Sequence, residues 1–190
     1  ATGPFVPPAD APPAVMAALA ARTDRLSQAG THVLEVAAVL GARIRHDVLL
    51  AVPGVLAAGL HEVVRCGMLL PAGSEADVSR FEHELLRRVA LDRLAPATAA
   101  EIHHLVLGAL ESTGSVAPAV RAHHAVEAAS IDATRAVRAA KEAALVAAHS
   151  RDHAEAGSWW LTAADVLAER VPRAVTERLD LRVRAGEALI

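Results

Sequence analysis

A histidine at the start of an expected helix is the residue in this chain best placed to do chemistry. It lies in the segment Arg80-Phe81-Glu82-His83-Glu84-Leu85-Leu86-Arg87. We expect a strand to end and a helix to begin there, and an imidazole held rigidly at such a junction can reach a ligand docked alongside. The residues alone also allow a plainer interpretation, in which His83 caps the helix or packs against its first turn.

Ten histidines raise the question of a metal site. Those at candidate spacings are two adjacent pairs and one pair four residues apart: His103-His104, His123-His124, and His149 with His153. Adjacent residues point about 100° apart on a helix, so neither pair can share one ligand face. A turn is expected between the members of the third pair. Since no Cys-x2-Cys or His-Glu-x2-His pattern occurs, we predict packed or solvated histidines and no metal ligands.

The sequence shows no recognisable catalytic machinery. It has no Gly-x4-Gly-Lys-Ser/Thr loop for nucleotide phosphates, no Gly-x-Ser-x-Gly turn and no arranged Ser/His/Asp set. The single cysteine, Cys66, lies in an apolar helical run and is expected to be a buried structural thiol. We therefore predict no catalytic residue and no cofactor within this chain.

Composition predicts a mainly α fold. Of 190 residues, 53% are hydrophobic but only 2% aromatic, which indicates alanine-rich helices that pack closely. The formal net charge of −3 gives no overall field to attract nucleic acid. No signal peptide and no apolar run of about 18 residues is present, so we expect a soluble cytoplasmic protein without membrane contact.

The first part of the chain predicts a winged helix. Residues 1–13 carry five prolines and are expected to be a linker, followed by a winged-helix domain over 14–95. Two apolar arms around a turn containing Gly73 and Ser74 indicate a small β-hairpin after the first helices. The expected elements are helices at 14–26, 31–40, 47–52 and 54–66, hairpin arms at 68–70 and 78–81, and a helix at 84–94.

The remainder, 96–190, predicts antiparallel helical hairpins of an α-solenoid. The expected helices are 97–112, 117–129, 132–149, 153–171 and 173–190. The pattern Ala156-x3-Trp160-x2-Ala163 matches the second helix of a tetratricopeptide-type (TPR-like) repeat. An apolar stripe on the last helix has no expected cap, which indicates a region truncated at its C-terminus. That stripe comprises Val175, Leu179, Leu181, Val183 and Leu189.

A winged helix suggests DNA binding, but the charges disfavour it. The recognition helix would be 54–66, and its expected exposed residues are Val55, Ala58, His61, Glu62 and Arg65. One arginine beside one glutamate cannot anchor phosphates or read bases. Across 27–94 the acidic residues outnumber the arginines by one. We therefore predict a structural or regulatory winged helix without direct nucleic-acid contact.

Several of these segments together resemble the region that follows the ATPase core in STAND-class signalling proteins, particularly large LuxR-type (MalT-like) regulators. The resemblance covers about residues 12–171. The residues that carry it are Leu26-Ser27, the run 33–41, Leu60, Val63, Gly67, Leu69 and Leu70, the segment 80–87, Ile102-His103, Ala109-Leu110-Glu111, and Ala122-His123-His124.

The resemblance implies a role for His83. In this class the winged helix follows the nucleotide-binding domain, and the histidine of the motif contacts the phosphate of bound ADP. The repeats act as a sensor arm for a protein or small-molecule effector. ATP and ADP are thus implied for the parent protein, whose nucleotide-binding domain would be the intramolecular partner. One departure is Leu91, which stands where the family often has tyrosine.

Three hypotheses follow. The first is a non-catalytic regulatory and scaffold fragment of a STAND-type transcriptional regulator. In the second, the same relay belongs to a signalling enzyme such as a nucleotide cyclase or a kinase. The third is a stand-alone TPR-like adaptor that binds a partner protein, which the proline-rich entry and the unfinished last helix disfavour.

Overall fold

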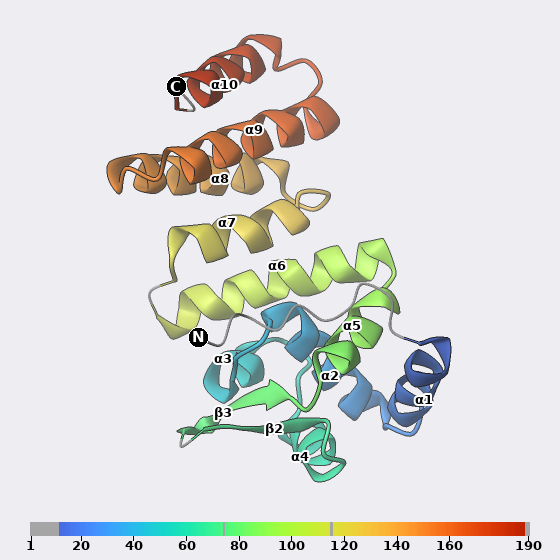
Figure 1. Ribbon diagram of the computed structural model, residues 1–190. Helices are drawn as coiled ribbons and strands as arrows, with labels where there is room; N and C mark the ends of the chain where they lie inside the picture. The colour runs from blue at the N-terminus through green and yellow to red at the C-terminus, as the bar shows by residue number, and fades with distance from the viewer. Residues whose placement is uncertain (1–11, 74, 115, 189–190) are drawn as a thin grey trace. The chain divides into compact units, whose positions relative to one another are not determined.

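The computed structural model describes residues 12–73, 75–114 and 116–188. Most of the predicted linker, 1–13, lies outside these residues. The described chain is mainly helical, with ten helices and one small three-stranded sheet, so the predicted fold class is confirmed at this level (Figure 1). The described chain divides into two compact units: the first comprises the residues up to 50 together with 54–94, and the second comprises 51–53 together with the residues from 95 onward. Among the described helices, none has both the length and the apolarity to cross a membrane.

The first unit alternates helices with short strands. Its elements are α1 (Pro13–Thr23), α2 (Gln28–Leu40), β1 (Ile44–Arg45), α3 (His46–Ala51), α4 (Ala57–Arg65), β2 (Leu69–Ala72), β3 (Glu75–Phe81) and α5 (Glu84–Asp92). The strands are antiparallel in the order β1-β3-β2, and Leu69 lies opposite Phe81. The predicted hairpin is therefore present as β2 and β3. Strand β1, which pairs Ile44 with Ser79 on the other edge of β3, was not predicted from the sequence.

The limits of α2 follow from local chemistry. Ser27 caps its N-terminus by accepting a hydrogen bond from the Gly30 N–H. Gly41, with φ of 111°, follows its last residue, and this backbone conformation favours glycine. Between these ends α2 carries a buried face that includes Val33 and Val36. The helix thus forms the centre of the first unit and packs against both α4 and α5.

A glycine lets α4 approach α2 closely. A Cβ atom added at Gly59 would lie 2.5 Å from the carbonyl oxygen of Ala29 and 2.9 Å from Cγ2 of Val33. Both distances are shorter than real Cβ contacts, and the nearer atom belongs to the backbone and cannot turn away. The backbone of α4 at Gly59 therefore lies directly against α2, and only glycine fits at this position.

The second unit contains five helices, and each packs against the next in the chain (Figure 1). They are α6 (Pro96–Thr113), α7 (Pro118–Glu127), α8 (Ala133–His149), α9 (His153–Arg170) and α10 (Val175–Ala188). Proline stands at the first position of α6 and α7, where its missing N–H costs nothing. Asp132 and Asp152 cap α8 and α9. The turn predicted between His149 and His153 is confirmed, with Arg151 in the left-handed region.

Alanine dominates the core of the second unit. Ala140 and Ala144 of α8 and Ala163 of α9 are fully buried, so these two helices approach closely. Trp160 is the large side chain among them, and the Arg184 guanidinium lies 5.5 Å from the centre of its ring. Trp160 and Ala163, which the sequence singled out, therefore share one core with the alanines of α8, and Ala156 is buried as well.

Some expectations about exposure are wrong. Val55 is buried, because α4 begins only at Ala57 and Val55 therefore lies before the helix and not on its exposed face. Cys66 is exposed, since it lies just beyond the last turn of α4. The stripe on the last helix is divided: Leu181 is buried, whereas Val175, Leu179 and Val183 are exposed. Its last predicted member, Leu189, lies outside the described residues.

The contact at Gly59 can be tested by a single methyl group. We expect Gly59→Ala to lower the free energy of unfolding by about 2 kcal/mol, because the helices must separate to admit the new atom. The matched control is Gly108→Ala in α6, where nothing lies within 4 Å of an added Cβ. That variant should gain about 0.5–1 kcal/mol from the helix propensity of alanine. Urea denaturation followed by circular dichroism measures both, and equal stability of Gly59→Ala and the parent chain would contradict the packing.

Candidate functional site

His83 lies at the N-cap position of α5 and is exposed. Its backbone is extended, with φ of −137° and ψ of 140°, and its side chain makes no capping hydrogen bond. Within the described part of the chain, its imidazole has no polar partner at all. The residues alone left two interpretations open: contact with an external ligand, or capping and packing at the start of the helix. The described structure shows neither capping nor packing by the His83 side chain. Its ring is available to a ligand from outside.

The backbone around His83 is fixed on both sides. Before it, the Glu82 N–H donates to the Met68 carbonyl oxygen at 3.0 Å, which extends the hairpin beyond Phe81. After it, the Leu86 N–H donates to the His83 carbonyl oxygen at 2.9 Å and closes the first turn of α5. The fully buried Leu86 anchors that turn in the core. The junction therefore holds the Cα of His83 in place while its side chain stays exposed.

The acidic neighbours of His83 are both engaged. Glu82 accepts from Arg22 at 2.8 Å, and Glu84 accepts from Arg87 at 2.7 Å. Arg87 also donates to the carbonyl oxygen of Ala38 at 2.9 Å, which joins α5 to α2. Because each carboxylate has its own guanidinium, the charge beside the imidazole is largely balanced. An anion can thus approach the first turn of α5 without meeting unpaired negative charge.

The face of α4 offers few groups to nucleic acid. Ala58, His61 and Arg65 are exposed, as predicted. Glu62, predicted to be exposed, is half-buried and accepts hydrogen bonds from the backbone N–H and the hydroxyl of Ser27. The hydrogen bond from the Ser27 hydroxyl lowers the pKa of the Glu62 carboxyl below its ordinary value, and the hydrogen bond from the Ser27 N–H adds a smaller effect in the same direction. This residue thus joins α4 to the start of α2.

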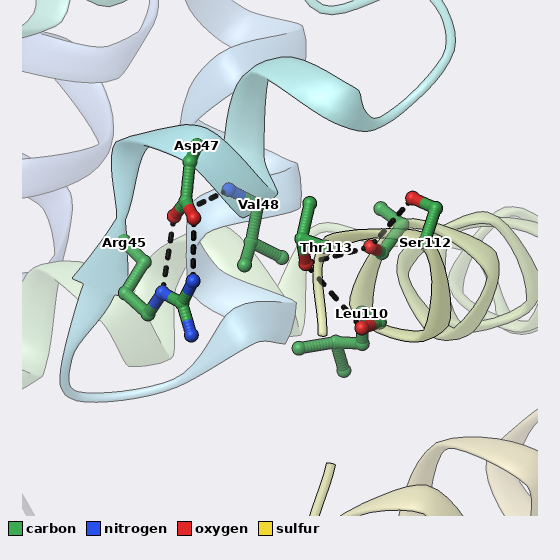
Figure 2. A network of polar contacts seen from close by, with 7 residues as sticks. Arg45, Asp47, Val48, Leu110, Ser112 and Thr113 are labelled. Atoms are coloured by element: carbon green, nitrogen blue, oxygen red, sulfur yellow. Dashed lines mark hydrogen bonds and ion pairs between the residues drawn. The ribbon is translucent and has the colours of Figure 1, made fainter. Parts of the chain in front are cut away.

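Near the edge strand β1 the arginines are also paired with acids. Arg45 binds both carboxylate oxygens of Asp47, and Asp47 also accepts from the Val48 N–H at 2.9 Å (Figure 2). The hydrogen bond between them raises the pKa of Arg45 and lowers that of Asp47. Arg43 contacts both oxygens of Glu75 at 2.9 and 3.0 Å. These pairs line a cavity of about 570 Å³ with alternating charges, which gives no excess of cations for phosphates.

A groove lies along the second unit between α8 and the start of α10. Its volume is about 280 Å³, and its lining includes Val137 and Lys141 of α8 and Leu167 of α9. Lys141 donates to Glu177 of α10 at 2.9 Å across it. The groove therefore combines an apolar floor with charged groups at its rim, as surfaces that hold a peptide or small molecule commonly do.

Three histidines that the sequence analysis kept apart come together. Nδ1 of His103 lies 3.0 Å from Nδ1 of His124, and both rings are buried, at 8% and 3% exposure. The exposed His123 ring completes the group, with centroids 5.5 Å from His103 and 5.2 Å from His124. One ligand atom from each residue lies within 4.8 Å of the others.

The prediction of separate, packed or solvated histidines considered each helix alone. Adjacent histidines of one helix do point apart, but α6 packs on α7 and brings His103 opposite His124. A signal was present in the sequence: His103 and His124 lie 11 and 10 residues from Gly114, close to the break between the helices. An antiparallel hairpin turning there places them opposite each other.

Burial controls the protonation of the two inner histidines. It lowers the pKa of His103 to about 4, with a smaller contribution from the nearby His123. Burial is also the main reason that the pKa of His124 is lowered to about 3, and the nearby His103 and His123 contribute less. Near neutral pH both rings are therefore neutral, and their Nδ1 atoms share one proton in a hydrogen bond.

These shifts predict a loss of stability in mild acid. In the unfolded chain both histidines take up protons below about pH 6.5, whereas in the folded chain they stay neutral down to about pH 4. Stability should thus be constant above pH 6.5 and fall below it, by about 1.4 kcal/mol per pH unit for each histidine. Urea midpoints between pH 7.5 and 5 measure this. His104→Gln should keep the same slope, and a flat profile between pH 6.5 and 5 would contradict it.

Comparison with known proteins found no relative of this chain. No protein-family model matches the chain, and no curated protein or solved structure is significantly similar to it.

Proposed function

We propose that this chain is the non-catalytic relay of a bacterial STAND-type signalling ATPase, most closely of the LuxR-type transcriptional regulators. The observation that carries the proposal is His83. It is exposed at the start of α5, has no polar partner within the described chain, and stands in the segment that resembles the ADP-contacting motif of this class. A side chain held there without an internal partner is suited to a contact with another domain.

The order of elements supports a winged-helix interpretation of the first unit. From α2 onward the chain runs helix, strand, helix, helix, strand, strand, and the sheet order is β1-β3-β2. In this interpretation α4 is the recognition helix and the β2–β3 hairpin is the wing. Since α4 exposes one arginine and its glutamate is engaged by Ser27, we propose that the domain transmits a conformational signal and does not contact DNA.

The second unit supports a TPR-like sensor arm. Its consecutive helices pack in chain order, and Ala156, Trp160 and Ala163 occupy one buried face of α9. The groove between α8 and α10 is the proposed effector surface for a protein segment or a small molecule. The exposed residues Val175, Leu179 and Val183 on α10 offer an apolar face to a further helix.

The proposed switch depends on one hydrogen bond. The imidazole N–H of His83 donates to a phosphate oxygen of ADP held by the nucleotide-binding domain of the parent protein, and the N-terminus of α5 adds a favourable dipole. While ADP is bound, this contact keeps the winged helix closed against that domain. Exchange for ATP or binding of an effector releases it. The relay would act in the cytoplasm, where both nucleotides are available.

The alternatives differ in what lies outside the chain. A nucleotide cyclase or a kinase could use the same relay with a different output domain. A stand-alone TPR-like adaptor would use the groove between α8 and α10 but would have no need of an exposed, unpartnered His83. The behaviour of that residue therefore separates the adaptor from the two switch proteins.

The first test uses the chain itself. We expect it to bind ADP only weakly, with no heat signal in isothermal titration at micromolar protein concentration, because one imidazole and one helix terminus cannot hold a nucleotide. We also expect no ATP hydrolysis in a phosphate-release assay. Micromolar or tighter binding of ADP would show that the chain is not merely half of a nucleotide contact.

The second test uses an intact protein in which this chain follows its nucleotide-binding domain. His83→Ala should speed ADP dissociation about tenfold, the effect of losing one hydrogen bond to a charged group, and raise basal output. His61→Ala is the matched control, because that histidine is also exposed but lies on α4. Release of a fluorescent ADP analogue measures the rate. An off-rate unchanged by His83→Ala would remove the sensor role.

A further inference from the structure

The packing of α6 on α7 brings three imidazoles together, and all the possible metal ligands in this group are histidine nitrogens. His103 comes from α6, and His123 and His124 come from α7. We propose that these three histidines form a binding site for a divalent late transition-metal ion, with zinc as the ion that fits best. This site is independent of His83, and the proposal does not depend on the nucleotide switch.

The distance between the two buried rings suits a shared ion. Zinc holds imidazole nitrogens at about 2.0–2.1 Å, so two ligands at the tetrahedral angle lie about 3.3–3.4 Å apart. The Nδ1 atoms of His103 and His124 are 3.0 Å apart and must separate by only a few tenths of an ångström. In that hydrogen bond one of the two Nδ1 atoms carries the proton. When an ion binds, this ring takes the tautomer with its proton on Nε2, and both Nδ1 lone pairs are then free for the ion.

His123 supplies the third ligand from the solvent side. Its ligand atom lies within 4.8 Å of both others, and its ring is exposed, so a small side-chain rotation can bring it to the ion. The same exposure leaves the fourth position open to water. Three protein nitrogens and one open position form the ligand set of many zinc sites with exchangeable ligands.

The donor type selects the metal. Magnesium and calcium prefer oxygen ligands, and none belongs to this group of three. Imidazole suits zinc, copper, nickel and cobalt. Neutral imidazole is the form that binds metal. An ion would replace the single hydrogen bond between the rings by a crosslink between α6 and α7.

The experiment uses the 190-residue chain without a histidine tag, after dialysis against a chelator. Titration with ZnCl2 should show one ion per chain with a Kd of micromolar or tighter. CoCl2 should give the visible absorption bands of a low-coordinate nitrogen site, and excess zinc should raise the Tm because it binds only the folded state. MgCl2 should produce none of these effects.

His123→Ala tests the ligand set without disturbing the core, because this side chain is exposed. It should weaken zinc binding at least tenfold, abolish the cobalt bands and leave the metal-free Tm unchanged. His104→Ala is the matched control, since that residue neighbours His103 but is not in the group, and it should bind zinc like the parent chain. The proposal is overturned if the parent chain binds no zinc at 100-fold molar excess. It is equally overturned if His123→Ala keeps the parent affinity or if His104→Ala loses it.

Discussion

Close approach of helices at small residues is the constraint on which both units depend. With two phenylalanines, two tryptophans and no tyrosine, the chain has few aromatic side chains to fill space between helices. The helices must therefore come near enough for backbone and methyl groups to touch. Gly59 allows this between α4 and α2, and buried alanines such as Ala140 and Ala163 allow it between α8 and α9. Helices packed this closely have little freedom to shift, so the residues that they carry keep defined positions.

The packing of the helices determines the environment of His83, His103 and His124, and hence which ligands each could bind. His83 is held by its backbone at the start of α5, yet its ring is exposed and without a polar partner within the described residues, which suits an external contact. His103 and His124 face each other inside the second unit, where burial keeps them neutral. In the roles proposed above, the same residue type would donate a hydrogen bond to an anion in one unit and offer lone pairs to a cation in the other.

Local signals predicted the helices well, whereas long-range contacts were out of reach. Proline at the start of α6 and α7 and aspartate caps on α8 and α9 act over a few residues, so their limits were visible in the sequence. Strand β1 was missed because two residues carry no periodicity, and it exists only through its pairing with β3. The engagement of Glu62 by Ser27 and the meeting of His103 with His124 likewise depend on residues that packing brings together.

The central claim is that His83 contacts a nucleotide phosphate outside this chain. The most direct measurement is nitrogen-15 NMR of the histidine side chains in an intact protein that carries this chain after its nucleotide-binding domain. On addition of ADP, the ring nitrogens of His83 should shift to values typical of a strong hydrogen bond, while those of the exposed His61 stay unchanged. Ring signals of His83 that are identical with and without ADP would contradict the claim.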